Sequence, residues 1–121
     1  VGFESLDRRA LRAMHKSPEV VTAFFGEVDK ARGANRALDE LVGSLRGDLR
    51  DLADLEYRAR GLVDRMAVAI QAALLLQHAP GCVADAFCAS RVAVAGGPRN
   101  YGTLPRGVDC AAIIERATPV A

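Results

Sequence analysis

The run MAVAIQAALLL at residues 66–76 constrains the fold most, because Gln71 is its one polar residue. Alanine and leucine favour helix, and a helix that is apolar nearly all round is buried on most of its sides. The run is too short to cross a bilayer, and charged or polar residues flank it on both sides. We therefore expect a core helix over about residues 55–78, surrounded by other helices.

Apolar residues recur at helical spacing before and after this run. Ser17 precedes Pro18 at the start of a second helix, and Asp109 precedes the last one; serine and aspartate are typical N-terminal caps. The expected helices run over about residues 5–15, 17–33, 35–52, 55–78, 82–94 and 109–116.

Each long helix is expected to bury one side. The predicted core side chains are Val20, Val21, Phe24, Phe25 and Val28 in the second helix, Leu38, Leu41, Val42, Leu45 and Leu49 in the third, and Leu62, Met66, Ile70, Ala73 and Leu74 in the fourth. Strand-like alternation is lacking. The sequence thus predicts an all-α fold, an antiparallel helical bundle of about five to six helices, as a single domain over residues 1–121.

Charge and cysteine usage narrow the function classes. The chain has 16 lysines and arginines against 15 aspartates and glutamates, a net charge of +1 that gives no general argument for nucleic-acid binding. A basic patch must therefore come from local clustering. The three cysteines, Cys82, Cys88 and Cys110, lack metal-site spacing, so we expect reduced thiols that pack as small apolar side chains in a cytoplasmic protein.

The motifs indicate no active site. The loop AGGPRNYG lacks the lysine and serine of a phosphate-binding loop. Asp48, Asp51 and Asp54 lack the glycine and glutamate of a calcium loop and are read as a solvated acidic patch. His15 and His78 lie near no nucleophile in the sequence. We predict no catalytic, cofactor-binding or metal-binding residue in this chain.

Several stretches together resemble one known family. The segments LRAMHKSPEVVTAFFGEV, RMAVAIQAALLLQHAPGCVADAFCASRV and GGPRNYGTLPRGVDCAAIIERA are similar to the carboxyl-terminal part of acyl-CoA dehydrogenases of the AidB-like, DNA-alkylation-response branch. The resemblance covers about residues 11–117. It implies that residues 1–80 end the carboxyl-terminal helical domain of the family and that residues 81–121 form a terminal helix-loop-helix cassette.

The same resemblance sets expectations for function. The family oxidises acyl-CoA substrates with FAD, and the terminal region of this branch is associated with double-stranded DNA. The catalytic glutamate of the family lies in a Trp-Glu-Gly-Ser-Gly-Asn loop, which would fall just before Val1; Glu4 is at the wrong offset to replace it. The isolated chain is therefore expected to be inactive and to bind no FAD.

The resemblance also implies partners for this chain. They are the remaining flavin domains or a second copy, together with double-stranded DNA, and no membrane. Arg12, with Arg8 and Arg9 beside it, occupies the side of the helix expected to meet DNA. The alternative interpretation is a non-enzymatic helical module that oligomerises or binds double-stranded DNA.

Overall fold

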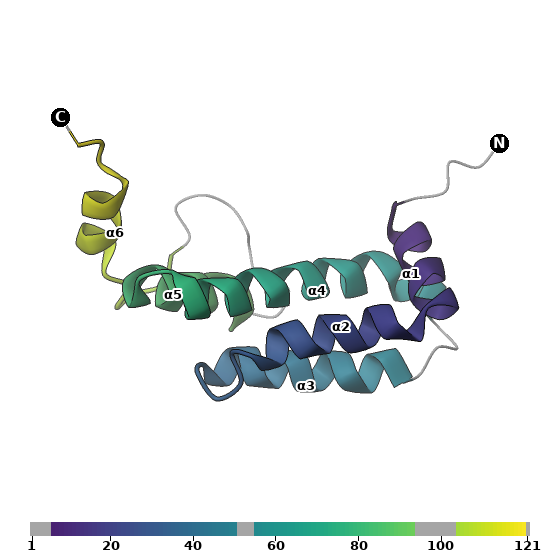
Figure 1. Ribbon diagram of the computed structural model, residues 1–121. Helices are drawn as coiled ribbons and strands as arrows, with labels where there is room; N and C mark the ends of the chain where they lie inside the picture. Colours follow the sequence, from purple (N-terminus) through teal and green to yellow (C-terminus); the bar gives the residue numbers. More distant parts are fainter. Residues whose placement is uncertain (1–5, 51–54, 94–103, 121) are drawn as a thin grey trace.

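The computed structural model describes residues 6–50, 55–93 and 104–120. All regular structure in these ranges is helical, which confirms the predicted all-α fold (Figure 1). No helix in the described ranges is long and apolar enough to span a lipid bilayer. The helices are α1 (Leu6–Lys16), α2 (Pro18–Asp29), α3 (Arg36–Arg50), α4 (Leu55–His78), α5 (Gly81–Phe87) and α6 (Cys110–Ala117), with a π-helical turn over Cys88–Val92 directly after α5.

Three of these helices lie side by side with alternating direction. Figure 1 shows α2 and α3 running antiparallel below the long helix α4, with α1 standing across one end of the bundle and α6 at the other end. Helix α1 packs against α2 and α4, and Met14 anchors it to the core. Helix α6 touches the bundle through α5. The two ends of the bundle therefore carry different elements.

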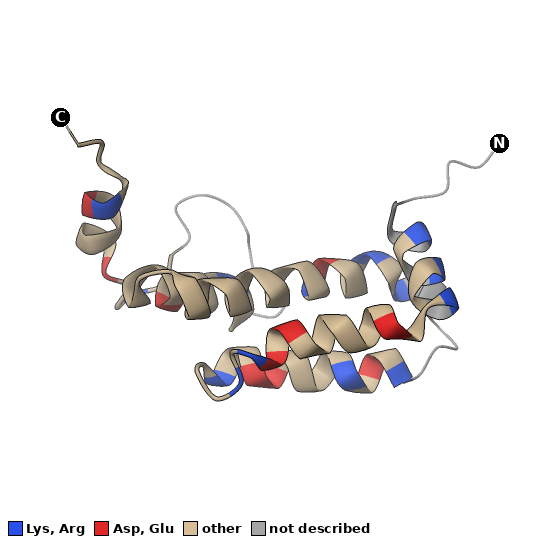
Figure 2. Cartoon of the chain, viewed as in Figure 1, with Lys and Arg blue, Asp and Glu red and all other residues tan. Residues whose placement is uncertain are grey.

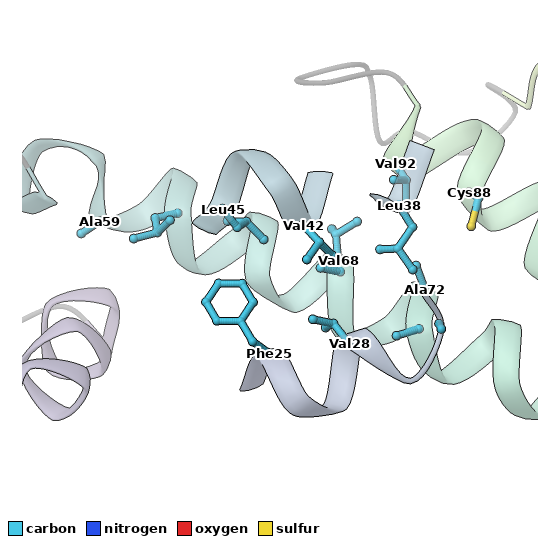
Figure 3. Packing of buried hydrophobic residues seen from close by; sticks show 14 residues of the cluster. Phe25, Val28, Leu38, Val42, Leu45, Ala59, Val68, Ala72, Cys88 and Val92 are labelled. Atoms are coloured by element: carbon cyan, nitrogen blue, oxygen red, sulfur yellow. The ribbon is translucent and has the colours of Figure 1, made fainter. Parts of the chain in front are cut away.

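The core forms where α2 and α3 meet a face of α4 that is rich in alanine. On α4, Ala69, Ala72 and Ala73 are fully buried, so the neighbouring helices approach its backbone closely. Their large side chains fill the space, and Figure 3 shows those of α2 and α3 pointing toward one another beside α4. The buried large residues of α2 and α3 are Phe25, Val28, Leu38, Val42 and Leu45.

Two predicted core residues, Val20 and Leu74, lie on the outside instead. Val20 is 46% exposed and Leu74 is 40% exposed. Val20 precedes buried Phe25 by five residues and Leu74 follows buried Ala69 by five, which places each about 140° around its helix from the buried position. The expectation that α4 is buried on most sides is therefore wrong over this part of its surface.

Two helices begin at a residue whose side chain caps the free N–H groups of the first turn. The Asp109 carboxylate accepts a hydrogen bond from the Ala112 N–H at 3.0 Å, and the Asn35 side chain accepts one from the Leu38 N–H at 3.2 Å. Ser17 lies where the cap of α2 was expected, but its side chain makes no capping hydrogen bond. Gly33 does not end α2, which stops at Asp29; it lies in the following turn with φ of +82°.

The fifth predicted helix, residues 82–94, is not uniform. It begins as α5 and continues as the π-helical turn, in which the Ala93 N–H donates to the Cys88 carbonyl at 2.8 Å. The Ser90 hydroxyl donates to the Ala86 carbonyl at 2.7 Å. The Thr22 hydroxyl makes the same i−4 bond, to the Pro18 carbonyl, within regular α2, so this bond alone does not explain the π-helical turn. Val94 lies outside the described residues.

The alanine face of α4 gives a test of this packing. We expect Ala72→Leu to lower the free energy of unfolding by about 1–3 kcal/mol, because the added carbons have no space between α4 and its neighbours. Ala23→Leu makes the same change at an exposed position of α2 and should stay within about 0.5 kcal/mol of the parent. Urea titrations followed by circular dichroism measure both. Equal destabilisation by the two substitutions would contradict the assigned core.

Two glycines with different backbone geometry give a second test. Gly47 lies in the interior of α3, where an added Cβ meets no atom within 4 Å, so Gly47→Ala should stabilise the protein by about 0.5–1 kcal/mol. Gly33 has equal space but a φ of +82°, so Gly33→Ala should destabilise it by about 1 kcal/mol. Thermal unfolding of both variants reports the sign, and a loss of stability on Gly47→Ala would contradict the placement of α3.

Candidate nucleic-acid interface

Helix α1 presents a row of cationic side chains to solvent. Arg9, Arg12 and Lys16 follow one another at intervals of three and four residues, which places them along one side of the helix, and all three are exposed. The structure thus brings two of the three predicted contact residues, Arg9 and Arg12, onto one accessible row. Arg8 belongs to α1 by its backbone, but its side chain lies outside the described part of the chain.

Two further arginines extend this surface from neighbouring helices. The end of α3 and the beginning of α4 lie at the same end of the bundle as α1 (Figure 1). Arg50 is in the last turn of α3 and Arg60 is near the start of α4, and both are exposed. Figure 2 colours basic positions blue on each of these three helices at this end. We call Arg9, Arg12, Lys16, Arg50 and Arg60 the basic end.

Four of the five cations of the basic end differ from the arginines of the helix contacts in their partners. Among the described residues, no carboxylate lies within ion-pairing distance of Arg9, Lys16, Arg50 or Arg60. An exposed arginine without a carboxylate partner keeps its guanidinium donors available for an anion from outside. Positive potential therefore accumulates at this end although the whole chain is nearly neutral.

Where α2 packs on α3, the charges neutralise one another. Asp29 of α2 accepts from Arg46 of α3 and, at 3.5 Å, from Arg32 in the turn between them. The Arg46 guanidinium also lies 4.3 Å from the centre of the Phe25 ring, a cation–π contact that fixes its position. These arginines serve the packing of α2 on α3.

The proposed acidic patch is also built into a helix contact. The Asp48 carboxylate of α3 accepts from Arg65 of α4 at 2.6 Å and lies 3.6 Å from Arg58. Arg65 donates in addition to the Ser44 hydroxyl at 2.5 Å. Asp48 therefore joins α3 to α4, which corrects its interpretation as part of a solvated, helix-capping patch. Asp51 and Asp54 lie outside the described residues.

Two hollows on the surface do not suit a dinucleotide. One, of about 470 Å³, lies between the start of α3 and α5 and contains the carboxylates of Glu40 and Asp85. The other, of about 370 Å³, lies between α2 and α3 and contains those of Asp29 and Asp39. Arginines line both hollows as well, Arg36 in the first and Arg32 and Arg46 in the second, and each pairs with a carboxylate of its own hollow. Their guanidinium groups are therefore already engaged and form no dedicated site for a pyrophosphate.

Titratable groups in the described residues offer little nucleophilic or metal-binding chemistry. Cys88 is buried beside the first hollow, and burial together with the nearby Asp85 carboxylate raises its pKa, which disfavours the reactive thiolate. Cys110 is exposed at the start of α6, so the expectation that the cysteines pack as buried apolar residues holds for Cys88 and is wrong for Cys110. No group of three or more metal-ligating residues occurs in the described ranges.

Comparison of the chain with protein-family models, with curated proteins and with solved structures finds no match in any of the three. Sequence reasoning located the cations of α1 from their spacing but missed Arg50 and Arg60. Those two join the surface because α3 and α4 run antiparallel, which brings the end of one helix beside the start of the next. The sequence did offer one signal for this neighbourhood, because the segment between α3 and α4 is short and short connections join antiparallel helices.

The environments of the cysteines predict an order of modification. Iodoacetamide at pH 8 should label exposed Cys110 first and buried Cys88 only on unfolding. Because the folded pKa of Cys88 is raised, the unfolded chain loses this proton first, and stability should fall as the pH rises past about 8.5. Mass spectrometry of digested samples measures the order. Cys110→Ser should remove the fast reaction, and rapid labelling of native Cys88 would contradict its burial.

Proposed function

We propose that this chain is the carboxyl-terminal helical portion of an AidB-like acyl-CoA dehydrogenase, and that its basic end binds the phosphate backbone of double-stranded DNA. The resemblance over about residues 11–117 motivates the first part. The row of exposed cations on α1, extended by Arg50 and Arg60, is the observation that carries the second. The all-α fold agrees with a helical region of that family.

The chemistry of the basic end favours phosphate over a base edge as the contacted group. The row on α1 runs from Arg9 to Lys16, a rise of seven residues or about 10 Å along the helix. Double-stranded DNA carries one charge per roughly 1.7 Å of its axis, so several phosphates lie within that length. Cations on one helix side therefore meet more than one phosphate, which positions a protein without reading sequence.

The proposed role in the flavoprotein is not catalytic. By the resemblance, FAD in the parent would accept the electrons removed from an acyl-CoA substrate, and the glutamate that takes the proton precedes Val1. In the two hollows, the lining arginines pair with lining carboxylates, which leaves no dedicated donor for a flavin pyrophosphate in the described part of this portion. We therefore assign to the chain no step of the oxidation.

Charge reversal on α1 tests the DNA contact. We expect the full chain to bind a fluorescein-labelled duplex at low salt, with a log–log salt slope of about 0.9 per phosphate contacted. Arg9→Glu and Arg12→Glu should each weaken binding and reduce that slope by about one unit. Fluorescence anisotropy across a salt series measures both quantities.

The matched control is Arg32→Glu, the same charge change on an exposed arginine at the other end of α2. It alters net charge equally but should leave the salt slope unchanged. Equal losses for Arg9→Glu and Arg32→Glu would reduce the effect to net charge and overturn the basic end as the site. Flavin absorbance that sediments with the purified chain would overturn the non-catalytic assignment.

A further inference from the structure

Two of the three cysteines lie on helices that contact each other. Cys82 is the second residue of α5, and Cys110 is the first residue of α6. The two positions are far apart in the sequence, but α5 packs against α6, and Cα atoms at their contact lie within 8 Å of each other. Both cysteines are free thiols in this structure. The fold therefore brings two thiol-bearing helices together.

The directions of the helices place the starts of α5 and α6 at the same end of the bundle. Helix α4 begins beside α1, and its 24 residues carry the chain to the opposite end. There α5 begins at Gly81, three residues after the last residue of α4. Figure 1 shows α6 standing on that end, with its far end and the carboxyl terminus directed away from the bundle. The start of α6, with Cys110, is therefore the part that meets the start of α5, with Cys82.

The third cysteine, Cys88, differs from this pair in access and in position. Its side chain is 1% exposed, whereas Cys82 is half-buried and Cys110 is exposed. Cys88 follows Cys82 by six residues, which turns it about 120° around the helix axis. A reagent in solution therefore reaches Cys110 and Cys82 before it reaches Cys88.

Helix α6 is free to adjust its position on α5. None of its residues is buried, and its main contact is with α5. A disulfide requires two Cα atoms about 4.4–6.8 Å apart. From a helix contact within 8 Å, a small movement of α6 reaches this range, and it displaces no buried side chain.

We propose that Cys82 and Cys110 are a redox pair that closes to an intramolecular disulfide on exposure to hydrogen peroxide. The Cys110 thiolate attacks one peroxide oxygen, the O–O bond breaks, and hydroxide leaves a sulfenic acid on Cys110. The Cys82 thiolate then attacks the sulfenic sulfur, so that the S–S bond forms, the S–O bond breaks and a second hydroxide leaves. The two thiol protons convert both hydroxides to water. The peroxide takes up the two electrons that the sulfurs lose.

Closure of this disulfide anchors α6 to the bundle. Helix α6 has eight residues, and isolated helices shorter than about 12 residues are marginal in water. The bond also closes the chain between residues 82 and 110, which restricts the unfolded state. The oxidation state of the pair therefore sets how firmly α6 is held. Because the pair lies at the opposite end of the bundle from the basic end, its oxidation is independent of DNA binding.

Peptide mapping identifies the bond, because an aspartate separates each cysteine from the next. Cleavage on the amino side of aspartate gives the peptides 64–84, 85–108 and 109–121, each with one cysteine. After the folded chain is treated with hydrogen peroxide, mass spectrometry without reductant should find 64–84 joined to 109–121, with the loss of two hydrogen atoms. A dithiol reductant should separate the two peptides again.

Thermal unfolding of the oxidised and the reduced chain tests the consequence for stability. The oxidised parent should melt at least about 5 °C above the reduced parent. Cys82→Ser and Cys110→Ser should each abolish the link and the shift, whereas Cys88→Ala should keep both. Each variant is compared with its own reduced form, so a change in its basal stability cancels.

Three results would overturn the redox pair. The first is Cys110 oxidised to a sulfenic or sulfinic acid with no linked peptide. The second is a link between two chains through Cys110, seen as a dimer on a gel without reductant. The third is a link from 109–121 to 85–108, which would assign the partner thiol to Cys88.

Discussion

Close approach of α2 and α3 to the alanine face of α4 is the constraint on which the rest of the structure depends. Because Ala69, Ala72 and Ala73 occupy little space, the larger side chains of the neighbouring helices, Leu45 and Val28 among them, complete the core at this surface. The described part of the protein buries no polar or charged residue, so its polar groups are distributed over the outside and the ends. The packing of the helices therefore decides which charged side chains become neighbours on the surface.

The charged residues divide into two groups with different roles. Asp29 and Asp48 each bind arginines across a helix contact, at positions that remain about one-third exposed. Such pairs contribute little stability, of the order of 0–1 kcal/mol each, but they fix how α3 lies on its neighbours. Of the basic end, Arg9, Lys16, Arg50 and Arg60 form no such pair with a described carboxylate. Under the proposed function, the anion that pairs with them comes from outside the chain.

The sequence predicted the long-range architecture better than the faces of individual helices. The bounds of α4 follow from its apolar run and from Pro80 beyond it, and they match the structure. Val20 and Leu74 were misplaced because every apolar residue near the stripe was assigned to it, although a five-residue offset turns a side chain outward. The π-helical turn at Cys88–Val92 was missed because the spacing of apolar residues does not distinguish an i−5 from an i−4 backbone hydrogen bond. The basic end was found only in part, since Arg50 and Arg60 reach it through tertiary packing.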